Sequence, residues 1–515
     1  MILHIDGPLK PYYVQTLAMI FFPGVKFPDG EEPGADVPEA WISLEEDGSG
    51  VCASVRLFVP GAGERRETTG SAQVPWTAGN GERDRVRKLA AGEAFLEAGR
   101  ELTGIRPPWG IMTGVRPAKV ATELFRAGYS LDEAAAAIAR DYLTEANKAR
   151  LAAEVSLAES ALVTPQSRKQ CSVYVGIPFC PTRCAYCSFV SYTSPGLLKL
   201  IPEYLEALFN DVDGVFSVIR EMGLGIASVY IGGGTPTVLT AEQLSALLGR
   251  IGRNLAALGA KPLEYTLEAG RPDTITEEKM AAAVEAGVTR ISVNPQSLNP
   301  EVLAAIGRAH TPEMFFDAYR IVRDSGVRDI NVDLIAGLPA DTPQSFRATV
   351  DGVSALDPEN VTIHTFSVKK SSEFRAEGRF DPSSVIAAQS VDYADSALRA
   401  SGYIPYYMYR QKNTVGNLEN VGWAKPGHEG LYNVYMMEEI HSIFASGAHA
   451  VTKLVSEPEE DGSVRIERLF QPKYPYEYLR EYRAENGERL NALRSAARAF
   501  FASPENREEN TIENH

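Results

Sequence analysis

Three cysteines within eight residues are the strongest chemical signal in this chain of 515 residues. Cys180, Cys184 and Cys187 stand in the stretch FCPTRCAYC, so their spacing is CxxxCxxC. A structural zinc ion needs four ligands and usually takes them from CxxC pairs. Three thiolates instead leave one iron of a 4Fe-4S cluster open to a chelating small molecule. The spacing therefore favours a cluster, with zinc or a chance match as the rarer alternatives.

The other two cysteines do not supply a fourth ligand. Cys171 precedes the first strand of the pattern described below, so we expect it at the opposite end of that strand from the cysteine loop. Cys52 stands in a strand-like run and is expected to be a small buried apolar residue. Five cysteines are too few, and odd in number, for a disulfide framework in so long a chain.

Short apolar runs alternate with amphipathic helical segments after the N-terminal third, which is the pattern of repeated βα units. Parallel strands joined by right-handed crossovers curl into a full or partial barrel, and ligands collect at the carboxyl ends of the strands. The predicted fold class is α/β, with a partial (β/α)6 TIM-like barrel. Six strands are predicted, at residues 173–179, 226–232, 263–269, 290–295, 328–337 and 360–367.

Polar residues gather at or just beyond the ends of these predicted strands. The cysteine loop follows the first strand, and the sequence GGGTPT (232–237) ends the second, where glycines let the backbone approach a ligand closely. The next four strands carry Glu268, Gln296, Asp333 and His364. Polar residues commonly punctuate strand ends, but that habit does not explain why they collect at one edge beside a cysteine cluster.

Composition divides the rest of the chain into further regions. Residues 1–165 contain a predicted hairpin with DGSG as its turn, followed by helical patterns, so we expect a separate α+β domain of unknown role. Residues 166–402 hold the barrel. Residues 403–475 are rich in Tyr, Asn, Gly and His, which favours a loop-rich and α-helical region that covers the substrate. Residues 476–515 are expected to form a helix and a disordered tail.

Charge and hydropathy exclude several classes of protein. The chain has 51 basic and 67 acidic residues, a formal charge of −16, which argues against nucleic acid or an anionic membrane as its main partner. The first residues include Asp6, no basic segment and only a short apolar run, so we expect neither a secretory signal nor a membrane span. We therefore expect a globular, cytoplasmic protein.

Three further sequence motifs, together with the cysteine motif, indicate a protein family. YVGIPFCPTRCAYCSF is followed by YIGGGTPT, then RISVNPQSLNPEVLAAIGRAHT, then INVDLIAGLPADT. In this order and spacing they resemble the radical SAM superfamily and, within it, the oxygen-independent coproporphyrinogen III oxidases (coproporphyrinogen dehydrogenases). The extra N-terminal domain and the YRQKN segment resemble the longer bacterial branch of that family.

The resemblance implies a 4Fe-4S cluster on the three cysteines and S-adenosylmethionine on its open iron, from which reduction yields a 5'-deoxyadenosyl radical. It implies that two propionates of coproporphyrinogen III are converted to vinyls, giving protoporphyrinogen IX in haem biosynthesis. An electron donor such as flavodoxin or ferredoxin and a second S-adenosylmethionine molecule are also implied.

The resemblance also implies which residues surround the two S-adenosylmethionine molecules. The motif positions around the first molecule are Tyr174, Gly233 and Glu268. Those around the second are Tyr186, Gly234, Thr235, Gln296, Arg308 and Asp333, with Ser367 nearby. Taken alone, Glu268 could accept hydrogen bonds from ribose hydroxyls or simply be solvated, and Tyr186 could pack beside an adenine or fill the loop. Arg308 stands in a helix-like segment where an exposed arginine is ordinary, so only the resemblance gives it a role.

A tetrapyrrole with four propionates requires positive charge in its pocket. Arg410 and Lys412, in the YRQKN segment, are the expected substrate-binding residues, with Lys369 and Lys370 beyond the sixth strand. Aromatic side chains could flank the flat macrocycle, and the candidates are Tyr406, Tyr407, Tyr409 and Trp423.

Two other functions fit the same barrel. Ser188 and Phe189 follow the third cysteine, whereas characterised oxidases commonly carry another cysteine two residues after it. A phenylalanine there is also found in family members thought to bind and deliver haem, so a radical SAM haem chaperone is the first alternative. Another radical SAM enzyme acting on a porphyrin-like substrate, by methylation or ring opening, is the second.

Overall fold

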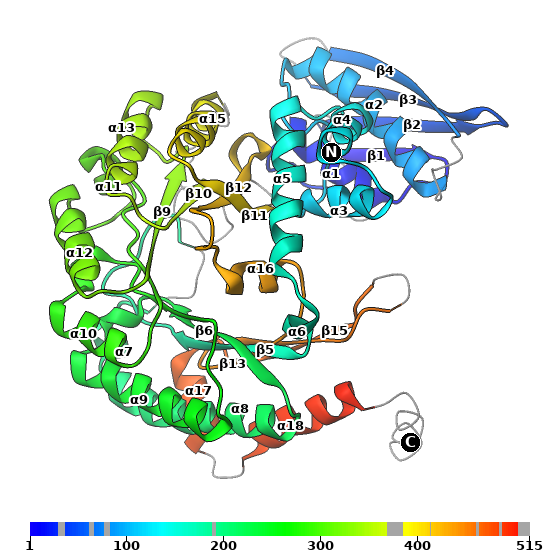
Figure 1. Cartoon of the computed structure of the whole chain (residues 1–515). Coiled ribbons are helices and arrows are strands. Elements are labelled where there is room, and N and C mark those ends of the chain that lie inside the picture. The colour runs from blue at the N-terminus through cyan, green and yellow to red at the C-terminus, as the bar shows by residue number, and fades with distance from the viewer. Residues whose placement is uncertain are drawn as a thin grey trace.

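The computed structural model describes residues 1–28, 37–60, 66–76, 83–187, 192–367, 385–411, 414–459, 463–483 and 487–502. Within these residues the strands form two sheets, one of four strands and one of eleven (Figure 1). Buried apolar side chains form a large cluster around the longer sheet, a second cluster around the shorter sheet and a small third one.

All six predicted barrel strands form. They are β5 (Gln170–Ile177), β6 (Gly225–Gly233), β7 (Glu264–Glu268), β8 (Arg290–Ser292), β9 (Asp329–Ala336) and β10 (Asn360–Thr365). They pair in parallel and in chain order. The edge strands of the whole sheet do not pair with each other, so the barrel stays open, as Figure 1 shows. The predicted α/β fold with a partial (β/α)6 barrel is confirmed.

Helices cover the outer face of this curved sheet (Figure 1). The main ones are α8 (Ile201–Glu221), α9 (Ala241–Leu258), α10 (Glu277–Glu285), α12 (Pro312–Asp324), α13 (Pro343–Ser354) and α15 (Val385–Ala400). In α9 the side chain of Thr240 accepts a hydrogen bond from the Gln243 N–H, and Gly259 ends the helix at a φ of 62°. Its apolar residues recur at three- and four-residue intervals and are buried, so this face packs on the sheet.

The region after residue 403 is more regular than its composition indicates. It contributes the strands β11 (Ile404–Arg410), β12 (Glu419–Ala424), β13 (Ser442–Ser446), β14 (Val451–Val455) and β15 (Ile466–Phe470). β12 and β11 extend the sheet beyond β10, and β13 to β15 extend it beyond β5. Helix α16 (Leu431–Met437) lies between these two additions in the chain, and α17 (Pro475–Arg483) and α18 (Glu488–Phe501) pack against α8. The region therefore builds both edges of the sheet.

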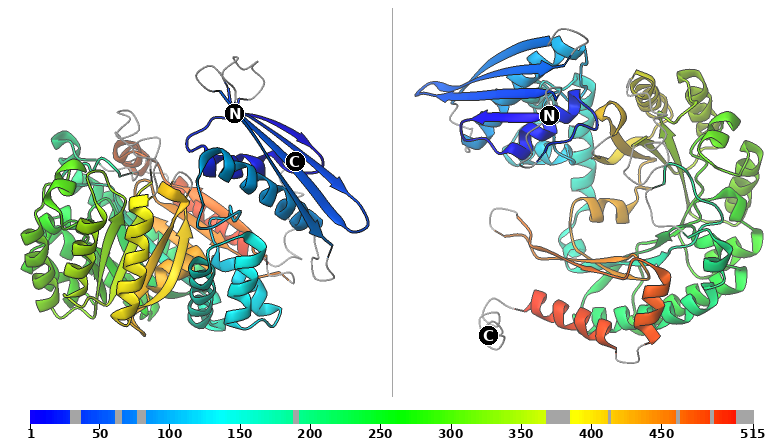
Figure 2. Two further views of the ribbon diagram at one scale, coloured as in Figure 1. Left: turned by 90° about the horizontal axis from the view of Figure 1, so that it is seen from above. Right: turned by 180° about the vertical axis from the view of Figure 1, so that it is seen from behind.

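The N-terminal part has its own sheet, which stands apart from the barrel in Figure 2. It consists of β1 (Ile2–Asp6), β2 (Glu39–Glu46), β3 (Gly50–Val59) and β4 (Arg66–Pro75), with α1 (Pro11–Phe21) and α2 (Arg83–Thr103). The predicted hairpin is β2–β3, and Asp47 Oδ1 in its turn accepts a hydrogen bond from the Ser49 N–H at 2.6 Å. Cys52 lies in β3 as expected but is only half-buried.

Helices α3 (Ala118–Arg126), α4 (Leu131–Tyr142) and α5 (Ala146–Leu162) belong to the large cluster of the barrel, whereas the cluster of the four-stranded sheet ends at Ile111. The division of the chain at residues 165, 402 and 475 stays a prediction. Residues 503–515, where the tail is expected, lie outside the described residues. In the described part of the chain, each helix is too short or too polar to cross a membrane.

A buried ion pair ties the N-terminal helices to the barrel. Lys148 of α5 is 3% exposed, and its Nζ donates to Glu419 Oε1 of β12 at 2.8 Å and to Asp392 Oδ1 of α15 at 2.9 Å. Trp109 Nε1 donates to the other oxygen of Glu419 at 2.7 Å. Burial favours the neutral form of Glu419, but the Lys148 charge outweighs it and keeps the pKa of this carboxyl below its usual value.

Replacing Lys148 by Met should destabilise the protein by about 3–5 kcal/mol, because the substitution leaves the Glu419 carboxylate buried without its cation. The free energy of unfolding in urea measures this loss. Lys261→Met, at an exposed position, is the matched control and should change stability by less than about 0.5 kcal/mol. Equal stability of the two variants would contradict the structural role of the ion pair.

Candidate functional site

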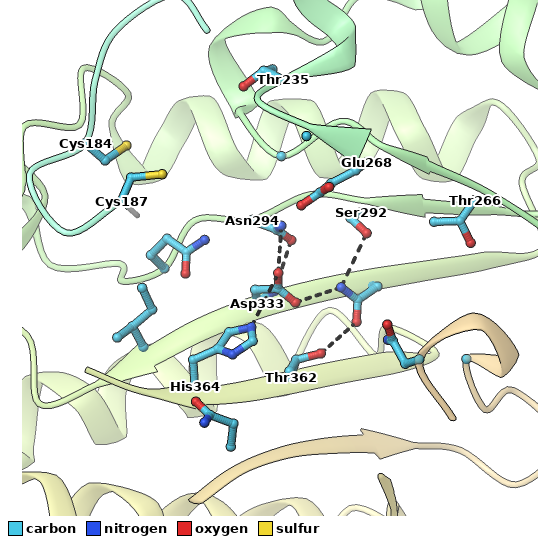
Figure 3. A pocket seen from close by; sticks show the side chains of 18 of the residues that line it. Cys184, Cys187, Thr235, Thr266, Glu268, Ser292, Asn294, Asp333, Thr362 and His364 are labelled. Carbon is cyan, nitrogen blue, oxygen red and sulfur yellow. Dashed lines mark hydrogen bonds and ion pairs between the residues drawn. The ribbon is translucent and has the colours of Figure 1, made fainter. Parts of the chain in front are cut away.

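The inner face of the barrel sheet is polar and encloses a cavity of about 450 Å³ (Figure 3). Alternate residues of β7, β8, β9 and β10 face it, because side chains of a strand point to opposite faces in turn. In a closed barrel such positions hold packed apolar layers. Here they are Glu264, Thr266 and Glu268 of β7, Arg290 and Ser292 of β8, Asn331 and Asp333 of β9, and Thr362 and His364 of β10. The interior of this barrel is therefore an open polar cavity and not a packed core.

The three cysteines line the cavity at the carboxyl end of the strands. Cys180 and Cys184 are buried and Cys187 is half-buried. Thr235 Oγ1 lies 3.3 Å from Cys180 Sγ, and Arg271 Nη1 donates to Cys184 Sγ at 3.6 Å. Among the described residues no three His, Cys, Asp or Glu side chains are placed to hold one ion together. Three thiols match a cluster in which each of three irons takes one thiolate, whereas a structural zinc ion would need four ligands.

Two carboxylates face each other across β8 in the middle of the cavity (Figure 3). Burial, and then the charge of Asp333, raise the pKa of Glu268 to about 8. Burial also acts on Asp333, but its contacts outweigh this effect and hold its pKa below the usual value. The amides of Asn294 and Asn331 each donate to Asp333 at 2.8 Å, and His364 Nε2 lies 3.7 Å away. A cation bound here would favour the ionised form of both carboxyls.

Arg308 and Gln296 place hydrogen-bonding groups that lack partners among the described residues at the carboxyl end of the strands, where the cysteines lie. Arg308 is buried and donates to the Asn294 carbonyl at 2.7 Å and to the Tyr186 hydroxyl at 3.0 Å. Gln296 has a φ of 69°, a strained conformation for a residue with a side chain. Arg308 Nε and Gln296 Oε1 are buried and make no hydrogen bond within the described part of the chain. Such groups are costly unless a ligand satisfies them.

Most residues expected from the sequence line this one cavity. They are Cys180, Cys184, Cys187, Tyr186, Gly233, Gly234, Thr235, Glu268, Gln296, Arg308, Asp333 and Ser367. Tyr174 does not line it but stacks against the cavity residue Tyr230, with ring centres 6.1 Å apart. Arg308 is not on an exposed helix surface, because α11 (Pro300–Ala305) ends before it.

The expected substrate-binding residues are placed differently. Arg410 points away from the cavity, and its guanidinium donates to the carbonyls of Met112 and Asn417 and lies over the Trp109 ring. From Tyr407 onward, alternation along β11 explains this, since Tyr407 and Tyr409 occupy the inward positions. The pairing register of β11 shifts between Pro405 and Tyr407, which allows Tyr406 to line the cavity as well. Lys412, Lys369 and Lys370 lie outside the described residues.

The aromatic candidates divide in the same way. Tyr406, Tyr407 and Tyr409 line the cavity, as the sequence predicts for residues that flank a flat ligand. Trp423 does not. It is buried in the core, where Arg399 stacks over its ring at 5.1 Å.

Several cavity residues were not anticipated, among them Arg271, Arg290, Asn294 and Asn331. A signal for the last three was present in the sequence. The strands LEYTLE, RISVN and NVDL carry a polar residue at every second position, which in a buried strand marks a polar inner face. Arg271 follows β7 in a loop and has no such periodic signal.

Comparison with known proteins agrees with this geometry. Residues 174–353 match the Radical SAM superfamily. The oxygen-independent coproporphyrinogen-III oxidase-like protein HemZ of Bacillus subtilis (strain 168) is 34% identical over 500 residues, covering 95% of this chain and 96% of that protein. This chain belongs to the radical SAM superfamily and, within it, to the coproporphyrinogen III oxidase-like family.

Two further similarities cover less of the chain. The heme chaperone HemW of the same Bacillus subtilis strain is 30% identical over 283 residues, 54% of this chain and 70% of that protein. The solved structure of the coproporphyrinogen III oxidase HemN from Escherichia coli, described as a radical SAM enzyme, has 22% sequence identity. It covers 64% of this chain and 73% of that one, with a TM-score of 0.48.

Membership in this superfamily implies a 4Fe-4S cluster and S-adenosylmethionine, and the residues present fit both groups. The three thiols provide one ligand for each of three irons. Gly234 lies so close to Cys180 that a Cβ on it would stand 2.9 Å from the sulfur. The carboxylates Glu268 and Asp333 suit a sulfonium and an ammonium group, and the guanidinium of Arg308 suits a carboxylate.

Replacing Gly234 by Ala should lower iron binding, since the new Cβ would also stand 2.5 Å from the Phe179 carbonyl oxygen and push the Cys180 loop away. Strain of about 1–3 kcal/mol is expected. The iron and sulfide content after anaerobic reconstitution measures the effect. Gly252→Ala, at a helix position with open space around it, should keep the iron content of the wild type, and a normal content in both variants would contradict the close approach.

Glu268→Gln should be more stable than the wild type at pH 9 by about 1–3 kcal/mol, but not at pH 5. The pKa of Glu268 is raised to about 8 in the folded protein. The folded state therefore holds a proton that the unfolded chain releases, and wild-type stability falls as the pH rises towards 8. Thermal unfolding of cofactor-free protein across this range measures the difference, with the exposed Glu285→Gln as control. A parallel pH dependence of all three proteins would contradict the raised pKa.

Proposed function

We propose that this protein converts coproporphyrinogen III to protoporphyrinogen IX without oxygen, as an oxidative decarboxylase of haem biosynthesis. The observation that carries the proposal is one continuous cavity lined by three thiols, three carboxyl groups and three tyrosines of β11. The similarity to the oxidase-like HemZ protein spans the N-terminal region as well as the barrel and supports this choice. A reduced flavodoxin or ferredoxin is proposed as electron donor, and the cytoplasm as location.

The proposed division of roles follows from the positions of the side chains. Cys180, Cys184 and Cys187 would hold the cluster, which together with S-adenosylmethionine would supply a 5'-deoxyadenosyl radical able to abstract hydrogen. Glu268 would give up its proton when a cationic group binds beside it, and Asp333 would add a second negative charge. Arg308 would bind a methionine carboxylate, in the first molecule or in a second one beside Gln296.

The substrate would approach the tyrosines of β11. A cavity of about 450 Å³ holds one ligand of ordinary drug size. With S-adenosylmethionine at the carboxyl end, a propionate arm rather than the whole macrocycle would therefore enter the part of the cavity that remains, towards its amino end. For each propionate the net change is loss of one hydrogen atom, one carbon dioxide and one electron, and a one-electron acceptor must take that electron. Because the barrel is open at its edges, bound substrate would have to exclude water and oxygen from the site to protect the radical.

Haem binding and delivery is the second candidate function. The similarity to the heme chaperone HemW favours it, and that similarity is confined to about half of this chain. The tyrosines and buried arginines of the cavity could bind haem as well as a porphyrinogen. The two functions differ in their products: a chaperone retains haem and leaves its propionates intact.

The decisive measurement is the product formed from coproporphyrinogen III. Anaerobically reconstituted protein, given S-adenosylmethionine and a chemical reductant, should yield protoporphyrinogen IX and a matching amount of 5'-deoxyadenosine by mass spectrometry. Cys184→Ser should abolish both products and the cluster absorbance, because one iron loses its only protein ligand. Cys52→Ser, in the N-terminal sheet, should retain them.

Other outcomes would select another function. Stoichiometric retention of haem without decarboxylation would favour the chaperone. A methylated or opened macrocycle would favour a different radical SAM enzyme. Tightly held zinc on the three cysteines, with no cluster after iron and sulfide are supplied, would overturn the proposal as a whole.

A further inference from the structure

The cavity reaches far beyond the residues assigned to the cofactors. Glu268 stands at the carboxyl end of β7 and Glu264 at its amino end, and both line the cavity. Four residues of strand span about 13 Å, so the cavity crosses the whole width of the barrel sheet. Its amino end is lined by Glu264, Arg290, Tyr406, Gly430 and Asn433. Of these residues, only Tyr406 has a role in the proposed function.

Arg290 is the central side chain there. It is 4% exposed, and its Nη2 donates to Asp329 Oδ2 at 3.2 Å and to the carbonyls of His428 and Glu429 at 3.0 and 3.2 Å. Its Nε lies 3.4 Å from Glu264 Oε2. The remaining nitrogen, Nη1, is buried and makes no hydrogen bond to any described residue. One edge of a buried guanidinium therefore lacks a partner.

The carboxylates near Arg290 are already engaged elsewhere. Glu264 accepts hydrogen bonds from the N–H groups of Leu431 and Tyr432, at 2.8 and 3.2 Å. Asp329 accepts from Arg328 at 2.7 Å and lies 2.6 Å from His428 Nδ1. Arg290 and Arg328 balance these two carboxylates in charge, so the free edge of Arg290 does not face an excess of negative charge.

From this arrangement we infer that Arg290 binds a carboxylate of the substrate at the amino end of the cavity. A planar guanidinium with free N–H groups matches a carboxylate in shape and charge. This carboxylate is distinct from the one assigned to Arg308, because the two arginines lie towards opposite ends of the barrel sheet. The inference rests on the proposed function, which makes the group a propionate of the tetrapyrrole.

A purely structural role does not account for Arg290. To hold Glu264 and Asp329 in place, the side chain needs only Nε and Nη2. A buried Nη1 without a partner costs about 1–3 kcal/mol, and the contacts to Glu264 and Asp329 do not offset that cost at Nη1. The loss is recovered when a ligand oxygen binds there.

Binding of coproporphyrin III, which has four propionates, and of its tetramethyl ester, which has none, tests the inference. Both are titrated by absorbance into the cluster-reconstituted protein. Arg290→Lys keeps the positive charge beside Glu264 and Asp329 but loses the planar fork, and Arg290→Met loses both. We expect affinity for the free acid to fall about tenfold in the first and about ten- to a hundredfold in the second, with affinity for the ester unchanged.

Arg328→Met is the matched control, because Arg328 binds the same Asp329 from outside the cavity. It should bind the free acid like the wild type. If Arg290→Lys folds with wild-type thermal stability and binds the acid normally, or loses acid and ester affinity equally, the inference is wrong. If the wild type cleaves S-adenosylmethionine but binds neither porphyrin, the tetrapyrrole proposal fails, and the inference fails with it.

Discussion

The polar inner face of the barrel sheet is the constraint on which the rest of the structure depends. Buried polar groups must be hydrogen-bonded, and those on β8, β9 and β10 largely satisfy one another. Asn331 links Ser292, Asp333 and Thr362, and Asn294 fixes Asp333 from the next strand. Because this network holds the side chains against the wall, they cannot fill the barrel, and a cavity remains.

A hollow barrel needs its stability from elsewhere, and the outer layer supplies it. The crossover helices bury apolar faces against the sheet, which is the large cluster of buried residues. Additional strands on both sides widen the sheet from six strands to eleven. Helix α5 then joins β12 and α15 through Lys148, which places a charged contact where the N-terminal helices meet the barrel. The parts outside the barrel thus support the wall of the site.

Local patterns were enough to predict the barrel and the place of the cysteine loop. Six apolar runs with intervening helices gave the strands, and CxxxCxxC gave three cysteines that line the cavity, because both signals are contiguous in sequence. Long-range placement was not predictable in this way. Strand β11 reads as a loop, since its pairing with β12 and the burial of its tyrosines depend on segments far along the chain. Arg410 was assigned to the cavity for its charge, but a one-residue step along β11 decides its side.

Arg308 shows the same limit in the opposite case, in which a residue expected at the surface lies in the cavity. An arginine is exposed by default, and nothing in AAIGRAH predicts that it is buried against Tyr186 and the Asn294 carbonyl. Its burial follows from the end of α11 and the return of the chain toward the cysteine loop, where the Ala185 N–H donates to the Ile306 carbonyl at 3.0 Å. Sequence periodicity describes single elements, whereas this contact joins two loops.

Charges of both signs are distributed along the cavity. Glu268 and Asp333 lie in its middle, Arg271 and Arg308 beside the thiols, and Arg290 at the far end, where it pairs with Glu264. Inside a low-dielectric site each of these groups acts strongly on a nearby ligand charge and weakly on a distant one. A ligand pair fits only if its cationic group lies near the carboxylates and its anionic groups reach the arginines. S-adenosylmethionine with a propionate-bearing tetrapyrrole has that distribution, so the spacing of charges along the barrel, more than any single residue, would select what reacts there.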